Sequence, residues 1–433
     1  MKPGIQDKIY EYITDDGEER SCKAISEEAC HEVPGNFLKN VTNGAATKLA
    51  EQLVSPGTTL PWIFGSLGVP AALAGALVPV KDAGSLLPQL FISAKIRAFA
   101  LRKWFWVVPA IMQGLSLVLM AFAVLYLKEL AAGLAVLLLL AIFSISSGVA
   151  SIAFKDVVAK TIPKGKRGQM LAMRATVGGV FTLGAGLWMY GGLAENESAR
   201  GYFWLIMAAA ALWFLAALLF AGIKEEPGAT EGGRTPVKEL KEAWKYFRED
   251  SNLRNFIFTR GLLMAIPLAQ PFFIVLGRKE IGTQVTSLGI IIVAAGIANI
   301  ISSPFWGRFS DKSSRNMMII VALLGMANIL LMASFPFWAA SLKNIYVFSL
   351  LLLIQVMAHG GARLSRKTYL IDFAPEKERP LYVSLSNTMI GVFTLLAAAL
   401  GLIAGLFGAQ VMLLVYAFLL ICAVVLAIRL KTV

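Results

Sequence analysis

The sequence predicts an all-α membrane protein in which twelve transmembrane helices form two pseudo-symmetric six-helix bundles. Composition, regularly spaced apolar runs and the placement of basic residues predict it. Of the 433 residues, 57% are hydrophobic and 15% are charged, and the mean hydropathy is +0.68. Soluble domains carry about 25% charged residues, so this composition argues against a water-soluble enzyme.

Twelve apolar runs have the length of a membrane span, which takes about 20 residues. Short polar joints separate the runs, except for one long polar stretch near the middle of the chain. We place six spans before this stretch, at residues 37–60, 68–94, 104–127, 132–155, 169–192 and 201–222. Six more follow it, at residues 254–276, 285–306, 316–336, 344–366, 381–405 and 410–430.

These spans divide the chain into four parts. Residues 1–36 are polar and acidic, unlike a secretory signal, and are expected to form a cytoplasmic tail. Residues 37–222 and 254–433 are the two bundles, and residues 223–253 are a cytoplasmic linker. Within the linker, Thr235 and Pro236 resemble a helix start, and apolar residues then recur at helical spacing, which predicts an amphipathic helix against the membrane.

The basic residues predict the orientation. Short cytoplasmic loops retain Lys and Arg, and with both termini inside, the inner side holds 31 of the 40 basic residues against five outside. We therefore expect a multi-pass protein of the cell inner membrane with both termini cytoplasmic. The lipid bilayer explains most of the net charge of +13, so no nucleic-acid partner is expected.

Cysteine usage does not indicate a metal site. Cys22, Cys30 and His31 lie near one another in sequence, but a fourth ligand is missing. We expect reduced thiols here, no metal and no cofactor. The chain also lacks the G-x-x-x-x-G-K-(S/T) phosphate loop and the H-E-x-x-H motif, so neither an ATP-driven pump nor an enzyme is predicted.

The two halves of the chain are similar at an offset of 212 residues. The clearest repeat is a Pro-x-x-x-Arg turn, at 163–167 (PKGKR) and at 375–379 (PEKER), after the fourth span of each half. Two similar halves joined by a linker are typical of carriers whose binding site lies between halves that rock about it.

The loop after span 8, GRFSDKSSRN at 307–316, resembles the signature G-x-x-x-D-(R/K)-x-G-(R/K)-(R/K) of the major facilitator superfamily. Gly307, Asp311, Lys312 and Arg315 match it, whereas the second glycine is replaced by Ser314 or shifted. The equivalent loop of the first half, KIRAFALRKW, keeps basic residues but has no acidic one. Span 5 also lacks the Gly-Pro pair of the superfamily's drug exporters.

The resemblance implies alternating access by two six-helix bundles, with Asp311 and its basic neighbours forming a cytoplasmic gate. A carboxylate in a tight loop accepts hydrogen bonds from a facing helix N-terminus or arginine. Such a contact can form in one state and break in the other.

Four charged residues fall near the middle of spans 1 and 2, where a charge is costly. They are Lys48, Glu51, Lys81 and Asp82. In one interpretation, Glu51 or Asp82 exchanges a proton when its lysine partner is removed, because an isolated carboxylate holds a proton more readily. In the other, two fixed salt bridges tie spans 1 and 2 together. The sequence leaves both open.

Further polar residues within the spans are candidates for the walls of a substrate cavity. Arg174 and Arg260 either face this cavity, which would favour an anionic or zwitterionic solute, or extend to the membrane surface. With Lys48 and Lys81, the candidate contacts are Gln113, Arg174, Arg260, Gln270 and Gln355.

The sequence therefore predicts a secondary active transporter that moves a small solute by alternating access, with a proton or another ion as the coupling partner. We expect it to act as a monomer. The alternative is a non-transporting member of the same fold that serves as an assembly factor or sensor in a membrane.

Overall fold

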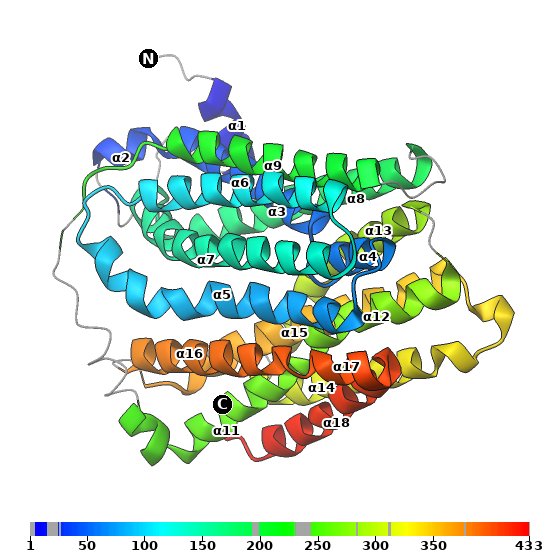
Figure 1. Ribbon diagram of the computed structural model, residues 1–433. Helices are drawn as coiled ribbons and strands as arrows, with labels where there is room; N and C mark the ends of the chain where they lie inside the picture. Colours follow the sequence, from blue (N-terminus) through cyan, green and yellow to red (C-terminus); the bar gives the residue numbers. More distant parts are fainter. Residues whose placement is uncertain are drawn as a thin grey trace.

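Long helices run between two opposite ends of the molecule (Figure 1). The computed structural model describes residues 5–14, 25, 27–192, 199–228, 230, 244–282, 285–310, 313–375 and 378–432. The helices of the first half are α1 Ile5–Thr14, α2 Glu27–His31, α3 Val33–Leu53, α4 Thr59–Ser66, α5 Ala71–Arg97, α6 Trp104–Tyr126, α7 Glu129–Thr161, α8 Arg167–Gly192 and α9 Ala199–Ala221. Those of the second half are α11 Ser251–Leu263, α12 Ala265–Ile281, α13 Val285–Ser310, α14 Ser314–Ser334, α15 Ile345–Phe373, α16 Arg379–Ala398, α17 Gly401–Phe407 and α18 Ala409–Ile428.

Within the described chain, ten helical segments are long and apolar enough to cross a membrane. Two of them join neighbouring helices, α11 with α12 and α16 with α17. The long helices α3 and α5 are not among the ten, because their charged and polar residues lower the hydropathy. With these two included, the all-α fold of twelve spans in two sets of six is confirmed.

The two ends of the molecule are named here by their loops. The linker side, at the left in Figure 1, holds residues 98–103, 162–166 and 222–228. The far side, at the right, holds two short 3-10 turns, Phe335–Phe337 and Ala340–Leu342, between α14 and α15.

The helix bounds of the two halves fall in register at the offset seen in the sequence. Helix α7 ends at Thr161 and α15 at Phe373, while α8 begins at Arg167 and α16 at Arg379. Both pairs differ by 212 positions. In the first half, Arg167 donates to the carbonyl oxygens of Ile162 (2.9 Å) and Ala159 (2.7 Å), so it satisfies free carbonyls at the end of α7.

The halves contact each other mainly through α8 with α13 and through α5 with α12, α16 and α17. Glycines permit the closest approach, on the far side. A Cβ at Gly289 of α13 would lie 2.7 Å from the backbone nitrogen of Tyr190 in α8, and one at Gly401 would lie 2.7 Å from the carbonyl oxygen of Ala72 in α5. Small residues allow helix backbones in a membrane to pack this closely.

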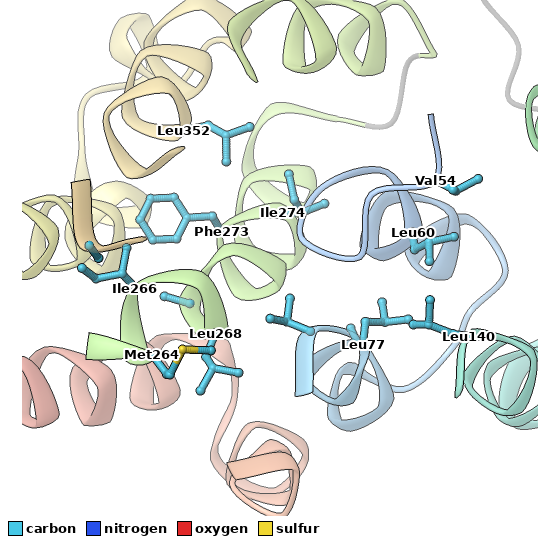
Figure 2. Packing of buried hydrophobic residues seen from close by; sticks show 14 of the residues in the cluster. Val54, Leu60, Leu77, Leu140, Met264, Ile266, Leu268, Phe273, Ile274 and Leu352 are labelled. Carbon is cyan, nitrogen blue, oxygen red and sulfur yellow. The ribbon is translucent and has the colours of Figure 1, made fainter. Parts of the chain in front are cut away.

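The first span of each half is broken rather than continuous. Pro56 and Gly57 lie in the turn between α3 and α4, and Met264 separates α11 from α12 ahead of Pro267. Proline cannot donate the helical hydrogen bond, which explains why each helix is interrupted. In Figure 2, residues next to these breaks, including Val54 and Leu60 in the first half and Met264 in the second, belong to one buried hydrophobic cluster.

The N-terminal region is more structured than a simple tail. Helix α3 begins at Val33, before the expected start at residue 37, and α1 packs against it. The Tyr10 ring is buried and lies 5.2 Å from the ring of Phe37. Lys166 donates to the carbonyl oxygen of Thr14 at 2.8 Å, which ties the end of α1 to the turn before α8.

Two other expectations concern the tail and the linker. Cys30 takes part in a disulfide bond, so the expectation of reduced thiols is wrong. Two cysteines suffice for a single disulfide, and the low cysteine count did not exclude one. In the linker, residues 231–243 lie outside the described part, whereas residues 244–249 are helical, and the stacked rings of Trp244 and Phe247 lie 5.0 Å apart.

Candidate functional site

A cavity of about 510 Å³ lies between the two halves. Helices α3, α5 and α8 line it from the first half, and α12, α13 and α15 line it from the second. The broken segments of both first spans also face it, through residues 54–58 and through Met264 and Pro267. Interrupted helices at the boundary between repeats are where transporters place their binding sites.

All four charged residues predicted from spans 1 and 2 line this cavity. Lys48 and Glu51 form an ion pair at 3.2 Å, and their side chains are 54% and 39% exposed. Lys48 passes directly over α8, where a Cβ at Gly178 would lie 2.6 Å from the lysine Cβ. Glycine therefore allows α8 to approach α3 where the pair faces the cavity.

Lys81 and Asp82 line the same cavity without direct partners. Among the described residues, neither side chain makes a hydrogen bond or an ion pair within 4.0 Å. Their backbone is held by neighbouring hydroxyls, because Ser144 of α7 donates to the carbonyl oxygen of Lys81 and Ser85 donates to that of Asp82 at 2.9 Å. The alternative interpretation had two fixed salt bridges that tie spans 1 and 2 together. Among the described residues, Lys48 pairs with Glu51 within α3, and no salt bridge joins these four residues between α3 and α5.

Helix α15 adds a stripe of basic residues that the sequence analysis placed toward the inner end of the span at 344–366. His359, Arg363 and Arg366 lie at helical spacing and all line the cavity. The spans were placed with residue 366 at an end, whereas α15 continues to Phe373. The positive-inside rule attributed these arginines to the cytoplasmic surface, and the long helix places them beside the cavity instead.

The two sets of charges act on each other across the cavity. Asp82 interacts electrostatically with Arg366, and Lys81 with both Glu51 and His359. The cavity is lined by four cations, namely Lys48, Lys81, Arg363 and Arg366, and by two carboxylates, Glu51 and Asp82. With His359 neutral, the formal charge of the lining is +2.

Uncharged polar groups line the cavity near the break in the first span. The amide nitrogens of Gln52 and Gln270 and the hydroxyl of Thr58 are buried and make no hydrogen bond with the described residues. Gln270 was predicted as a cavity contact, whereas Gln52 and Thr58 were missed. The Ser-Pro-Gly sequence at 55–57 was the available signal, because it marks a break in a membrane helix.

The other candidate contacts are absent from this cavity's lining among the described residues. The two arginines instead join helices within one half. Arg174 of α8 donates to the carbonyl oxygen of Asn40 (2.9 Å) and to Oδ1 of Asn43 (3.2 Å) in α3. Arg260 of α11 donates to Ser386 Oγ (2.6 Å) and Asn387 Oδ1 (2.8 Å) in α16. Neither arginine extends to the membrane surface.

The remaining two glutamines are fully buried. Gln355 accepts a hydrogen bond from Asn328 and donates to the carbonyl oxygen of Ile266, both at 2.9 Å. The Gln113 amide makes no hydrogen bond with the described residues.

The cavity is closed on the far side by contacts between the halves. Arg278 of α12 donates to the carbonyl oxygen of Trp62 in α4 at 3.0 Å, and its guanidinium lies 5.0 Å from a ring centre of the same tryptophan. Toward the linker side, a second cavity of about 140 Å³ shares Asn299, Gly360 and Arg363 with the first and reaches Lys367. Lys367 thus extends the polar lining of the cavity region along α15 toward the linker side.

Comparison with known proteins identifies the fold. A family model described as Major Facilitator Superfamily matches residues 269–433. A crystal structure of the nucleoside transporter NupG is similar with a TM-score of 0.71, at 13% identity over 91% of this chain and 98% of that one. That of a D-xylose-proton symporter has a TM-score of 0.65, at 15% identity over 92% and 97%. The later part of the chain therefore matches this superfamily in sequence, and the chain has the fold of these transporters.

Curated relatives share sequence with the chain over shorter stretches. An uncharacterized protein of Mycobacterium tuberculosis is 26% identical over 268 residues, which is 60% of this chain and 50% of the relative. The matched region therefore spans half the length of that relative. The Staphyloferrin B transporter of Staphylococcus aureus is 36% identical over 75 residues, 17% of this chain and 18% of that transporter.

The superfamily gate motif is only partly described. Asp311 and Lys312 lie outside the described residues, so the predicted gate contact stays a prediction. Gly307 lies near the end of α13, and Arg315 donates to the carbonyl oxygen of Leu430 at 3.2 Å, which joins α14 to the end of the chain.

In the first half, a carboxylate from elsewhere in the chain occupies the equivalent loop. The Glu225 side chain is fully buried and accepts hydrogen bonds from the backbone N–H of Arg102 (2.9 Å) and of Lys103 (2.7 Å). Lys160 pairs with it at 2.8 Å. The loop has no acidic residue of its own, and Glu225 follows α9, too distant in sequence for the motif to reveal.

Proposed function

We propose that this protein is a secondary active transporter that moves a small solute by alternating access and couples the movement to protons. The observation that carries the proposal is the placement of Glu51 and Asp82. Both carboxylates line a cavity between the two halves, beside the broken first helix of each half. Ionisable residues kept within membrane spans are costly, and in carriers they mark the path of substrates and protons.

Protons would be exchanged at these two carboxylates. Glu51 is paired with Lys48 at 3.2 Å, and Asp82 faces Arg366 across the cavity. A cation stabilises the ionised form of a nearby carboxylate. When rocking of the halves or a bound solute separates the cation from the carboxylate, the carboxylate takes up one proton from water in the cavity and becomes neutral. The reverse movement returns that proton.

The far-side contacts are those that must open for the alternate state. Arg278 with Trp62 and the close packing of α8 on α13 join the two halves there. The ties made by Arg174 and Arg260 lie within one half each, so they keep each bundle rigid while the interface opens. Packed interfaces of this kind switch between discrete arrangements.

We also propose that the linker side faces the cytoplasm of a cell with the protein in its inner membrane, and that the transporter works as a monomer. The distribution of basic residues supports this orientation. The cavity lies within a single chain, so a second copy is not needed to complete it.

Transport can be tested without knowing the solute. The full chain is reconstituted into liposomes, a pH difference of one unit is imposed, and a low-molecular-weight cell extract is added. Mass spectrometry of the liposome contents then shows which compounds accumulate relative to protein-free liposomes. We expect accumulation that requires the gradient and disappears with Glu51→Gln or Asp82→Asn.

Glu249→Gln is the matched control, because this carboxylate is 62% exposed and forms only a 3.9 Å pair with Lys245. Normal accumulation by both cavity variants would refute proton coupling through these carboxylates. If the wild-type chain moves no compound under either direction of the gradient, the transport proposal fails and the sensor or assembly role becomes the better account.

A further inference from the structure

The cavity contains cations that the protein itself leaves without an oxygen partner. Among the described residues, Arg363 and Lys81 have no hydrogen-bonded or ion-paired side-chain partner. Arg366 donates only to the sulfur of Met264, at 3.3 Å, and its Nε is buried without any partner. Sulfur is a weak acceptor, so all three groups retain free donors.

Three other arginines within the spans differ from these cations, because each has an oxygen acceptor. Arg174, Arg260 and Arg278 each donate to at least one carbonyl, hydroxyl or amide oxygen at 2.6–3.2 Å. Arginines that join helices are therefore given oxygen acceptors in this fold. At the cavity, by contrast, Arg363 is exposed and Lys81 and Arg366 are half-buried, so their donors are open to a solute within the membrane spans, where a charge without a partner is costly.

We propose that the cavity binds an organic anion with about two negative charges, held by Arg363 and Arg366 of α15 and by Lys81 of α5. This inference rests on the transporter function proposed above and specifies its substrate class. Carboxylate and phosphate share the required chemistry, since both present oxygen atoms that a guanidinium binds in a bidentate manner.

The charge balance sets the number of negative charges. Glu51 is occupied by Lys48 at 3.2 Å. The lining then holds one further carboxylate, Asp82, beside three further cations, Lys81, Arg363 and Arg366. One negative charge against three positive charges leaves an excess of two, which a dianion neutralises. A neutral or cationic solute would leave this excess in place.

The volume of the cavity and the uncharged polar residues of its lining indicate the size and the other groups of the solute. A volume of about 510 Å³ lies within the range of sites for small organic molecules. Gln52 and Gln270 belong to the lining, and their amide nitrogens make no hydrogen bond with the described residues. They would bind carbonyl or hydroxyl oxygens of the same solute, at a distance from its charged groups.

The test uses the purified full chain and measures its thermal unfolding. The low-molecular-weight fraction of a cell extract is divided on an anion-exchange resin into retained and flow-through pools. We expect the retained pool to raise the unfolding temperature and the flow-through pool to leave it unchanged. Treating the retained pool with a phosphatase distinguishes the two anion types: a lost shift indicates a phosphate ester and a preserved shift a carboxylate, and both support an oxyanion site.

Variants connect the effect to the named residues. Arg366→Gln and Arg363→Gln should each raise the concentration for half of the shift about tenfold or more, as expected for a lost hydrogen bond to a charged group. Arg363→Lys, which keeps the charge, should lose less than Arg363→Gln. The control is Arg200→Gln, since this arginine is exposed and is not part of the cavity lining.

Three results would overturn the proposal: no shift from the retained pool, a shift from the flow-through pool alone, or an undiminished shift in both glutamine variants. The measurement involves no membrane and no gradient. Anion binding can therefore be established even if proton-driven accumulation fails, and accumulation of a neutral compound would leave the transporter standing while refuting the anion site.

Discussion

The two halves of this protein have matching helices but contribute different charges to the cavity. The first half supplies both carboxylates, Glu51 and Asp82, together with two lysines, and is neutral overall. The second half supplies Arg363 and Arg366 and no acidic residue of the lining. At the offset of 212, the positions equivalent to these arginines are Ser151 and Phe154, and those equivalent to the carboxylates are Leu263 and Ala294.

This difference shows what an internal repeat preserves. Helix lengths, breaks and close contacts are set by hydrophobic length and by small residues, and both halves must satisfy them to span the membrane and pack. In our proposals, the carboxylates of the first half exchange the proton, whereas the two arginines of the second half, together with Lys81 of the first, bind the solute. Symmetry therefore predicts where the helices lie, and the departures from symmetry indicate which half has which task.

The largest expected effect separates these tasks. With a gradient of one pH unit, no membrane potential and one proton per transport cycle, the carrier can accumulate its solute about tenfold. Asp82→Asn should reduce the ratio of inside to outside solute concentration to about one. The variant should still exchange solute between pools of equal concentration, because the arginines remain. Arg366→Gln should lose both accumulation and exchange. Equal behaviour of the two variants in the exchange assay would contradict the division of tasks between the halves.

The second effect concerns Glu225, the buried carboxylate at the linker-side loop of the first half. Glu225→Ala removes a buried carboxylate, so two backbone N–H groups lose this acceptor and Lys160 loses its ion pair but retains the carbonyl oxygen of Ala100. Removing one partner of a buried ion pair costs about 3 kcal/mol or more of unfolding free energy, which denaturant unfolding of the purified chain would measure. Glu249→Ala, at an exposed pair, should cost less than about 1 kcal/mol. A similar small loss at Glu225 would show that this carboxylate does not hold the first-half gate.

The sequence predicted the span layout and four residues of the cavity for the same reason. Lys48, Glu51, Lys81 and Asp82 stand out because charges are rare within apolar runs of span length. Arg363 and Arg366 could not be recognised in this way, since basic residues at a span end are normally cytoplasmic. Only the full length of α15, which ends at Phe373, places them at the cavity.

Residues that act through contacts distant in sequence were also beyond prediction. The buried carboxylate at the loop 98–103 comes from Glu225, more than a hundred positions after that loop. The sequence showed an acid missing from that loop, but not which residue replaces it. In the same way, the sequence singled out Arg174 and Arg260 as charges within the spans but did not reveal their acceptors. The acceptors of Arg174 lie on the first span of its half, and those of Arg260 lie on the fifth span of its half.

The smallest expected effect tests the arginine ties within the halves. In the first half the arginine belongs to the fifth span and its acceptors to the first, and in the second half the reverse holds. Arg260→Gln should cost about 2 kcal/mol of unfolding free energy, since two side-chain acceptors lose a charged donor. Arg174→Gln should cost about 1 kcal/mol, because one nitrogen makes both of its hydrogen bonds.

Both variants should bind the retained anion pool with the affinity of the wild-type chain, since neither arginine is part of the cavity lining. Thermal unfolding with and without the pool measures stability and binding in one experiment. A loss of binding with Arg174→Gln at unchanged stability would place that arginine at the solute after all. The first half would then contribute a second cation, beside Lys81, to anion binding, and the two arginines of α15 would no longer be the main anion-binding groups.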